Sequence, residues 1–212
     1  MFSTAKFLTA AVAATPLALK GTPTSAIGTS VSIPTHAVGD IIVLFASRAS
    51  STTPTKPSAG GTVPAWVNIN VTTGASAISQ GSYYVVATAT DHPTGTWTDS
   101  FGLVAAVLSG PAASPIGGNS RRVGSSAGNC LTNATTLTDS SGKSVLLYCY
   151  SHTTVTSFNA APTGHTRQTT AVSTQGICMD TKDVTTSADA PTQTNTGSTI
   201  YASSTVEVLS AV

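Results

Sequence analysis

Histidine and cysteine side chains are the first candidates for chemistry in this sequence, because both bind transition metals. The chain has four histidines and three cysteines, and none of them falls at a CxxC, HxH or HExxH spacing. Three of the histidines adjoin Pro, Gly or Thr in expected turns, which favours ordinary surface residues. We therefore expect no metal and no other cofactor. The residues concerned are His36, His92, His152, His165, Cys130, Cys149 and Cys178.

Carboxylates and hydroxyls are the other groups that could react. A pair of carboxylates would suit glycoside hydrolysis, and eight acidic residues are present. Asp40, Asp91 and Asp139 occupy turn positions, where an Asp side chain bonds the local backbone. Glu207 alternates with valines in a late strand, and we expect it to face solvent. Serine is so frequent that no single one stands out, so we expect no catalytic residue and no enzymatic activity.

Trp66 and Trp97 are the candidate contact residues for a glycan or a partner, because flat aromatic rings offer stacking surfaces. The tyrosines add to this pool. Tyr83 and Tyr84 are adjacent, so their rings point to opposite faces of a strand and at most one is displayed. Packing in the core or in an interface is the favoured interpretation of all these rings.

Charge is the most unusual aspect of the composition. Only 8% of the residues are charged and the net charge is +1, whereas an ordinary soluble domain has roughly 25% charged residues. Arg121 and Arg122 form the only basic pair, which excludes an electrostatic footprint for nucleic acid. No apolar run reaches the length of a membrane span. A neutral, hydroxyl-rich surface suits a subunit packed among neighbours, and we expect a homo-oligomer.

The cysteines and the N-terminus each leave two interpretations open. Cys149 and Cys178 lie in two expected strands and are either neighbours in the sheet or free buried thiols. Residues 1–16 have one early Lys and an apolar run from Phe7 to Ala14, as in a secretory signal. The run is short and Pro16 soon interrupts it, which favours an arm that packs on the body or on a neighbouring subunit.

A repeated segment organises the chain. GDIIVLFAS, Gly39 to Ser47, recurs as GKSVLLYCY, Gly142 to Tyr150, 103 positions later. VAAVLSG, residues 104–110, is answered by TVEVLSA, residues 205–211. We therefore predict one sandwich domain, residues 17–212, built from the related halves 17–110 and 130–212 and a surface crossover at 111–129. Because Gly39 to Ser47 is apolar on both faces, we expect the opposite sheet to cover one face, and the arm or another subunit the other.

Strands are expected wherever β-branched and aromatic residues run between Gly- and Pro-rich turns. In the first half these are residues 17–20, 29–33, 40–47, 66–71, 82–90 and 101–109. In the second half they are residues 135–138, 143–150, 165–170, 176–181, 193–196 and 200–209. The segment 48–62 is expected to be a long polar loop.

The motifs AVGDIIVLFA, SYYVVATAT, GTWTDS, LVAAVLSG and SPIGG, with a weaker second copy after them, resemble the two-half jelly-roll virion proteins of tailed bacteriophages, including those of actinobacteria. The likeness covers residues 17–212 and leaves out residues 1–16. In the second half, Met179 to Asp183 is polar where the first half has VVATA.

The resemblance implies an all-β, jelly-roll-like antiparallel sandwich and a non-enzymatic structural role in the virion. A minor tail protein is the first expectation and a capsid decoration protein the second, with other virion structural proteins as partners. The alternative is a host-surface module that binds a cell-wall glycan. The resemblance transfers no active-site residue.

Overall fold

The computed structural model describes residues 16–72, 77–183, 189–197 and 200–212. Every regular element in these ranges is a β-strand and all strand pairs are antiparallel, so the prediction of an all-β antiparallel sandwich is confirmed. In the described ranges no helix could cross a membrane. The predicted arm, residues 1–16, lies outside the described residues except for Pro16.

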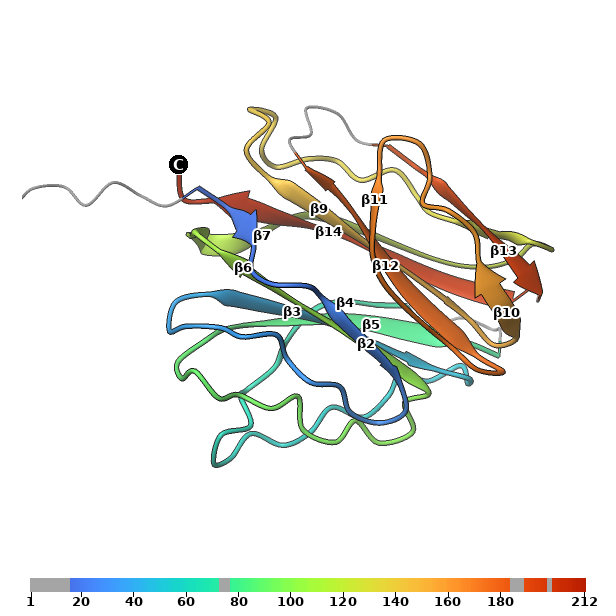
Figure 1. The fold of residues 1–212 in the computed structure, drawn as a ribbon, viewed down its shortest axis with the longest axis horizontal. Coiled ribbons are helices and arrows are strands. Elements are labelled where there is room, and N and C mark those ends of the chain that lie inside the picture. Colours follow the sequence, from blue (N-terminus) through green and yellow to red (C-terminus); the bar gives the residue numbers. More distant parts are fainter. Residues whose placement is uncertain (1–15, 73–76, 184–188, 198–199) are drawn as a thin grey trace, which may run out of the picture.

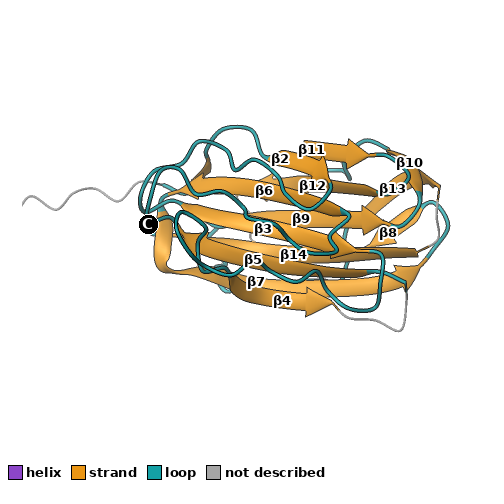
Figure 2. Cartoon of the chain, turned by 90° about the horizontal axis from the view of Figure 1, so that it is seen from below, coloured by secondary structure: helices purple, strands orange, loops and turns teal. Residues whose placement is uncertain are grey.

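Within the described residues, fourteen strands are arranged in three sheets (Figures 1 and 2). They are β1 (Ala18–Leu19), β2 (Thr24–Ile27), β3 (Ile41–Arg48), β4 (Val67–Thr72), β5 (Ser79–Val86), β6 (Gly102–Ser109), β7 (Pro111–Ser125), β8 (Asn129–Leu131), β9 (Val145–His152), β10 (Val155–Phe158), β11 (Thr166–Val172), β12 (Gly176–Asp183), β13 (Thr192–Gly197) and β14 (Ile200–Ser210).

Each half of the chain forms one large sheet. The N-terminal sheet has the order β1-β6-β3-β5-β4, with β2 also paired to β6, and the C-terminal sheet has the order β11-β12-β9-β14-β7. A small cover sheet, β10-β13-β8, lies outside the C-terminal sheet. The strands of each half therefore stay on one side of the interior, unlike the jelly roll that the resemblance implies, in which the chain passes back and forth between two sheets.

The interior lies between the two large sheets. Ile41, Val43 and Phe45 on β3 face Val145, Leu147 and other apolar residues of the C-terminal sheet, and all of them are buried. Strand formation follows from the sequence, because β-branched and aromatic side chains fit a pleated, fully covered surface. Each fully buried Val, Leu, Ile or Phe side chain contributes about 1.5–3 kcal/mol. The two faces together hold the halves as one body.

The outer faces of both sheets are covered by the chain itself. Ile42 and Leu44 on β3 pack with Trp66 and Trp97, which come from the loops around residues 49–66 and 87–101. On the C-terminal sheet, Leu146 packs beneath β8 and β10, which belong to the cover sheet. The prediction that β3 is buried on both faces is confirmed. The expectation that the arm or another subunit covers its outer face is corrected, because these loops fill that position.

The two halves share their strand order. Reading each sheet from one edge, β2, β6, β3, β5 and β4 correspond in chain order to β7, β14, β9, β12 and β11. The segments that cover the two sheets correspond as well. In the C-terminal half, β13 pairs with β10 on one side and with β8 on the other. In the N-terminal half, the loop that contains Trp97 and Thr98 is likewise joined to Thr55 on one side by a β-bridge and to Thr29 on the other by the hydrogen bond from Trp97 N to Thr29 O. The polar run at β12 thus occupies the same place as β5.

The matching of β3 to β9 at 103 positions needs a correction. That offset pairs Val43 with Leu146, but Val43 faces the interior whereas Leu146 faces the cover sheet. An offset of 104 positions, from Ile41 to Val145, places inward residues on inward residues. The difference arises because neighbouring side chains on a strand point to opposite faces, so a shift of one residue exchanges the faces.

The predicted crossover, residues 111–129, is also corrected. It forms β7, the longest strand, which follows β6 after the single residue Gly110 and pairs along β14. Its Pro and Gly content is typical of loops, but β7 lies at a sheet edge, where irregular pairing tolerates both residues. Two register shifts interrupt its pairing with β14.

Other strand predictions were partly wrong. The strand expected at 29–33 lies instead at β2, and residues 135–138 form no strand. Strands β8 and β10 were not expected, because with three and four residues they are too short to show an alternating pattern. The remaining predicted strands are confirmed within a few residues, apart from β5, which ends at Val86 rather than at residue 90.

Candidate functional site

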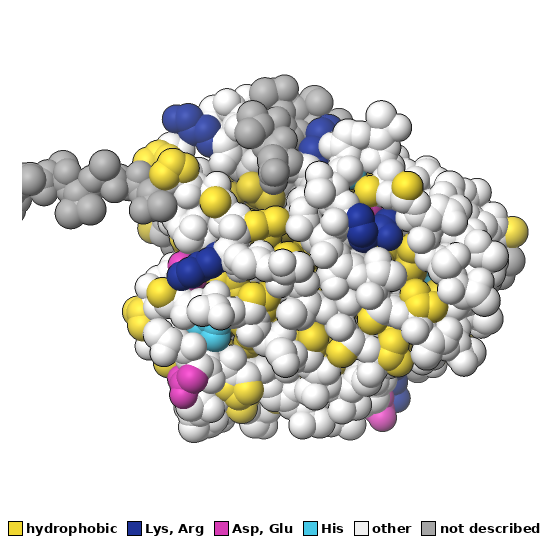
Figure 3. All heavy atoms as spheres, viewed as in Figure 1, with side chains coloured by type: hydrophobic (Ala, Val, Ile, Leu, Met, Phe, Trp, Pro, Cys, Tyr) yellow, Lys and Arg dark blue, Asp and Glu magenta, His cyan; other side chains and the backbone are white. Residues whose placement is uncertain are grey.

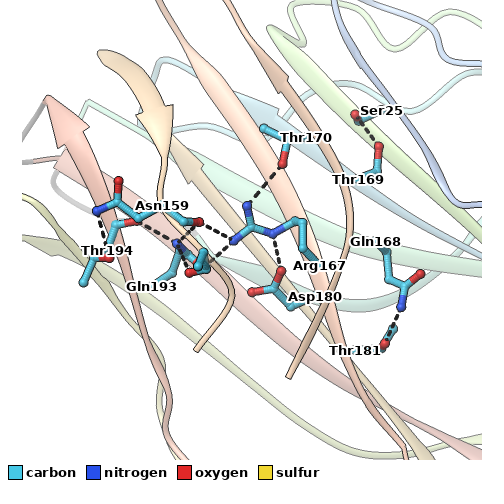
Figure 4. A network of polar contacts seen from close by, with 11 residues as sticks. Ser25, Asn159, Arg167, Gln168, Thr169, Thr170, Asp180, Thr181, Gln193 and Thr194 are labelled. Carbon is cyan, nitrogen blue, oxygen red and sulfur yellow. Dashed lines mark hydrogen bonds and ion pairs between the residues drawn. The ribbon is translucent and has the colours of Figure 1, made fainter. Parts of the chain in front are cut away.

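Four charged side chains of the C-terminal half form ion pairs near the cover sheet, in two groups. Arg167 on β11 makes an ion pair with Asp180 on β12. Its guanidinium also donates to Gln193 Oε1 at 2.6 Å, to the Asn159 carbonyl at 3.2 Å and to Thr170 Oγ1 at 3.3 Å (Figure 4). One Arg thus ties β11, β12 and β13 together.

Burial controls the ionisation of this network. Asp180 is fully buried, and desolvation raises its pKa even though the adjacent Arg167 acts in the opposite direction. Asp180 Oδ2 and the hydroxyl of Tyr150 have no hydrogen-bond partner among the described residues. The pKa of Tyr150 is raised mainly by burial, and Asp180 adds to the shift. Neither group is exposed to a substrate.

A second group of polar side chains surrounds Asp189. Its carboxylate accepts a hydrogen bond from the Tyr148 hydroxyl and one from Lys182 Nζ at 2.8 Å, and His165 Nε2 lies 3.4 Å away. Burial, reinforced by Asp189, raises the pKa of Tyr148. The donors around Asp189 hold its carboxylate in place, so this group fixes the segment before β13 to the sheet.

Glu207 occupies a different position from the one expected. Instead of facing solvent it is fully buried and accepts hydrogen bonds from the backbone N–H groups of Gly118, Thr138 and Asp139 at 2.6, 2.7 and 3.1 Å. A side chain on Gly118 would collide with the Thr136 carbonyl. The glycines of SPIGG therefore leave room for the segment that covers Glu207, which is a signal that the sequence carried.

Trp66 and Trp97 lie in the interior, which corrects their assignment as candidate glycan or partner contacts. Their exposed fractions are 2% and 0%, and both indole N–H groups donate to the Thr94 carbonyl at 3.1 Å. The two rings meet edge to face at 5.9 Å, and Tyr83 packs on Trp97 at 4.5 Å. Buried indoles satisfied by one carbonyl serve the core, as the favoured interpretation held.

The four histidines were expected at the surface, but the structure buries His36, His92 and His152. The rings of His36 and His92 stack at 5.8 Å, and His36 Nε2 accepts from the backbone of His92. His152 is fully buried beside Asn195 at 2.9 Å, and burial lowers its pKa to about 4. In the described ranges no three His, Cys, Asp or Glu side chains lie close enough together to hold a metal ion.

The three cysteines are free thiols, which resolves the two interpretations of Cys149 and Cys178. Although these two lie on paired strands, Cys149 faces the interior between the sheets and Cys178 faces the cover sheet. Their side chains therefore point apart. All three thiols are fully buried, and burial raises the pKa of each.

One serine motif was missed at the level of the sequence. Residues 124–128, GSSAG, match the GxSxG spacing of a nucleophile elbow around Ser126. An elbow needs a turn from a strand into a helix, whereas here β7 ends in a turn that leads to β8. Among the described residues no hydrogen bond joins Ser126 to His152, which is itself inaccessible. The match is a coincidence of composition.

An apolar groove lies at the end of the sandwich that holds both termini of the described chain. Its volume is about 490 Å³, and we name it the terminal groove. The residues that line it are Pro16, Leu17, Ala18, Leu19, Gly142, Lys143, Ser144, Val145, Ser210 and Val212.

Comparison of the chain with protein-family models, curated proteins and solved structures finds no match. The terminal groove and the surface around it therefore have to be interpreted from their own geometry.

Exposed apolar residues gather at the same end as the terminal groove. The large hydrophobic side chains that are exposed in the described ranges are Val38, Val67, Val86 and Val212. Strand pairing places them together at one end: Val86 is opposite Ile41 at the start of β3, Val67 is two residues away along β5, and Val38 precedes β3. We call this the terminal end. Most of the face shown in Figure 3 is backbone or side chains that are neither hydrophobic nor charged.

Proposed function

We propose that this chain is a non-enzymatic structural protein of a tailed-bacteriophage virion, a minor tail protein, that acts by packing against other copies and other virion proteins. The terminal end carries the proposal, because it holds all four of the exposed large hydrophobic residues in the described ranges. Exposed apolar surface concentrated in one place is typical of protein–protein contact sites.

Two further features support this role. Four charged side chains of the C-terminal half are engaged in internal contacts: Arg167 with Asp180, and Lys182 with Asp189. Both outer faces of the sandwich are already covered by the chain itself. Contact with neighbours is thereby directed to the end of the sandwich rather than to its faces. The sequence pattern that resembles two-half virion proteins supplies the identity of the particle.

The test is incorporation into particles. We expect mass spectrometry of purified virions from a phage that encodes this chain to detect it at a fixed copy number. Val38→Asp and Val86→Asp place charges at the terminal end without entering the core, and we expect the folded variants to be lost from the particles. Ser51→Asp, at the opposite end, is the matched control and should incorporate normally. Absence of the wild-type chain from purified virions would overturn the proposal.

A further inference from the structure

Two buried histidines belong to the chain segments that form the terminal end. His36 and His92 are 6% and 8% exposed, and their rings are parallel, with centroids 5.8 Å apart. His36 precedes the exposed Val38 by two residues, and His92 follows the exposed Val86 by six. Any change in the contacts of these two rings therefore acts on the chain next to both valines.

His92 accepts hydrogen bonds from the backbone through one ring nitrogen. Its Nε2 atom lies 3.1 Å from the backbone nitrogen of Thr88 and 3.2 Å from that of Ala89, and both N–H groups donate to it. An imidazole nitrogen accepts only through its lone pair, so Nε2 carries no proton and the ring proton is on Nδ1. Nδ1 in turn donates to the Thr62 carbonyl at 2.7 Å. These contacts require the neutral ring.

His36 has the same arrangement. Its Nε2 atom accepts a hydrogen bond from the backbone N–H of His92 at 3.2 Å, and its Nδ1 atom donates to the Pro34 carbonyl at 2.9 Å. This ring is therefore also the neutral Nδ1–H tautomer. Because the donor to His36 is the backbone of His92, the two rings form one continuous chain of hydrogen bonds that ties residues 34–36 to residues 88–92.

A proton on either Nε2 atom would convert an acceptor into a donor that faces another donor. On His92 it would displace the N–H groups of Thr88 and Ala89, and on His36 it would displace the N–H group of His92. A charged ring would then lie against its stacked neighbour. Histidine is the side chain that ordinarily changes its charge between pH 5 and 8. The hydrogen bonds of this pair are therefore sensitive to mild acid.

The surroundings of the pair offer no charge that would favour protonated rings. The charged residues on the chain segments around it are Lys20, Asp40, Lys56 and Asp91. Lys20 and Asp40 pair with each other at 2.7 Å. Tyr83, which belongs to the same cover cluster as the tryptophans, stays neutral because burial raises its pKa. Within the ranges that the structure describes, no carboxylate makes an ion pair with His36 or His92.

We propose that His36 and His92 form a pH-sensitive latch, which holds the chain around Val38 and Val86 in place while both rings are neutral and releases it when a ring takes up a proton at Nε2. Release loosens the turn after Val86 and the segment before Val38. This inference rests on the proposed function in one respect, because these valines are where we place contact with neighbouring subunits. Acid thereby weakens that contact without opening the interior between the sheets.

Nitrogen NMR of the purified full-length chain tests the hydrogen-bond pattern. At pH 7 the imidazole nitrogen shifts of His36 and His92 should be those of the neutral Nδ1–H tautomer. On acidification, each ring should become doubly protonated as the amide signals of its donors move. A ring that is already charged at pH 7, or that carries its proton on Nε2, would overturn the proposal.

Amide hydrogen exchange measures the opening itself. From pH 7 to pH 5, after correction for the intrinsic effect of pH on exchange, protection of the Thr88, Ala89 and His92 amides should fall about tenfold or more. The amides of Ile42 and Leu44, in the centre of β3, serve as the reference and should lose less. An equal loss at all of these amides would mean global unfolding and would overturn a local latch.

Matched variants assign the response to each ring. Glutamine supplies an acceptor oxygen but takes up no proton in this pH range, so His92→Gln should abolish the acid response of the Thr88 and Ala89 amides. His36→Gln should abolish that of the amide of residue 92. His165→Gln, in the C-terminal half, is the control and should respond as the wild type does.

Asp40→Asn separates the latch from the nearby carboxylate, and it should leave the acid response in place. If the response persists in both His36→Gln and His92→Gln, or if Asp40→Asn removes it, the proposal is overturned. The exchange experiment uses the purified chain, whereas the proposed function is tested by incorporation into particles. Either conclusion can therefore fail while the other stands.

Discussion

The two halves of the molecule cover the outer faces of their large sheets in different ways. Both build a large sheet with the same strand order, and both cover its outer face with three connections. In the N-terminal half these connections are irregular loops that contribute Trp66 and Trp97. In the C-terminal half they form the cover sheet, which is tied by Gln193 on β13 to the ion pair of Arg167 on β11 and Asp180 on β12.

The difference teaches that the sheet, and not its cover, is the repeated unit. Two large indole rings fill the volume over the N-terminal sheet, and their N–H groups need only one acceptor, the Thr94 carbonyl. Over the C-terminal sheet, the space is filled by strands whose side chains need each other as partners. We therefore expect the stability of the N-terminal cover to depend mainly on side-chain volume, and that of the C-terminal cover mainly on ion pairs and hydrogen bonds.

The largest effect should come from the interior that both halves share. Val43→Asp and Leu147→Asp each place an unpaired carboxylate between the large sheets, and we expect losses of about 5 kcal/mol or more, enough to prevent folding. Circular dichroism and urea unfolding of the purified variants measure this. A folded, stable product of either substitution would show that the interior is not where we place it.

Removal of an indole from the N-terminal cover should come next. Trp97 is fully buried, and Trp97→Ala should cost about 3–5 kcal/mol of unfolding free energy, because the cavity cannot collapse onto the sheet. Trp97→Phe retains most of the volume and serves as the control. Urea midpoints compare the two. A similar small loss in both variants would contradict a cover that depends on volume.

Breaking the ion pair tests the C-terminal cover. Arg167→Met leaves Asp180 buried without its cation, and we expect a loss of about 3 kcal/mol at pH 7. The double variant Arg167→Met/Asp180→Leu should recover most of this loss.

The pH dependence of the stability of Arg167→Met reports the protonation of Asp180. Without Arg167 the pKa of Asp180, already raised by burial, rises further above its unfolded value. The folded state then binds the additional proton, so the variant should gain stability relative to wild type as pH falls toward the unfolded pKa. Unfolding at pH 5 and pH 7 checks this, and a deficit that grows at pH 5 would contradict it.

The smallest effect should come from His152. Burial lowers its pKa from 6.5 to about 4, so its contribution to stability is present above pH 6.5 and is lost as pH falls toward 4. At pH 5 the loss should be about 2 kcal/mol. His152→Gln, measured by thermal or urea unfolding from pH 7 to pH 5, should lose less stability over that range than wild type. If the unfolding free energies of the two proteins fell equally with pH, His152 would not contribute to the pH dependence.

The sequence identified the sheets better than their covers. Runs such as Ile41–Phe45 leave no alternative to a strand covered on both faces, because every side chain in the run is apolar. Short segments such as β10, with four residues, carry no such signal, since their pairing depends on the sheet beneath them. The offset of 103 positions paired Leu146 with the inward-facing Val43, because a repeat in sequence does not specify which face of the strand points inward.

The candidate site was harder to predict than the fold. Trp66 and Trp97 were considered as exposed contacts, yet a sequence cannot show which loop folds over which face. The terminal groove escaped sequence reasoning because its wall is assembled from Leu19, Val145 and Val212, which are far apart along the chain. The glycines at positions 117 and 118 were the local signal for a buried Glu207, since they allow the close approach that its hydrogen bonds require.

The direct passage from β6 into β7 through Gly110 has a consequence for how the body holds together. Gly110 adopts a positive φ of 74°, which an L side chain disfavours, and this one residue carries the chain from one sheet to the other. Two separate sheets would have to find each other in solution, and dilution would part them. Joined at this residue, they meet at a fixed and high effective concentration. The association of the two sheets is therefore independent of protein concentration.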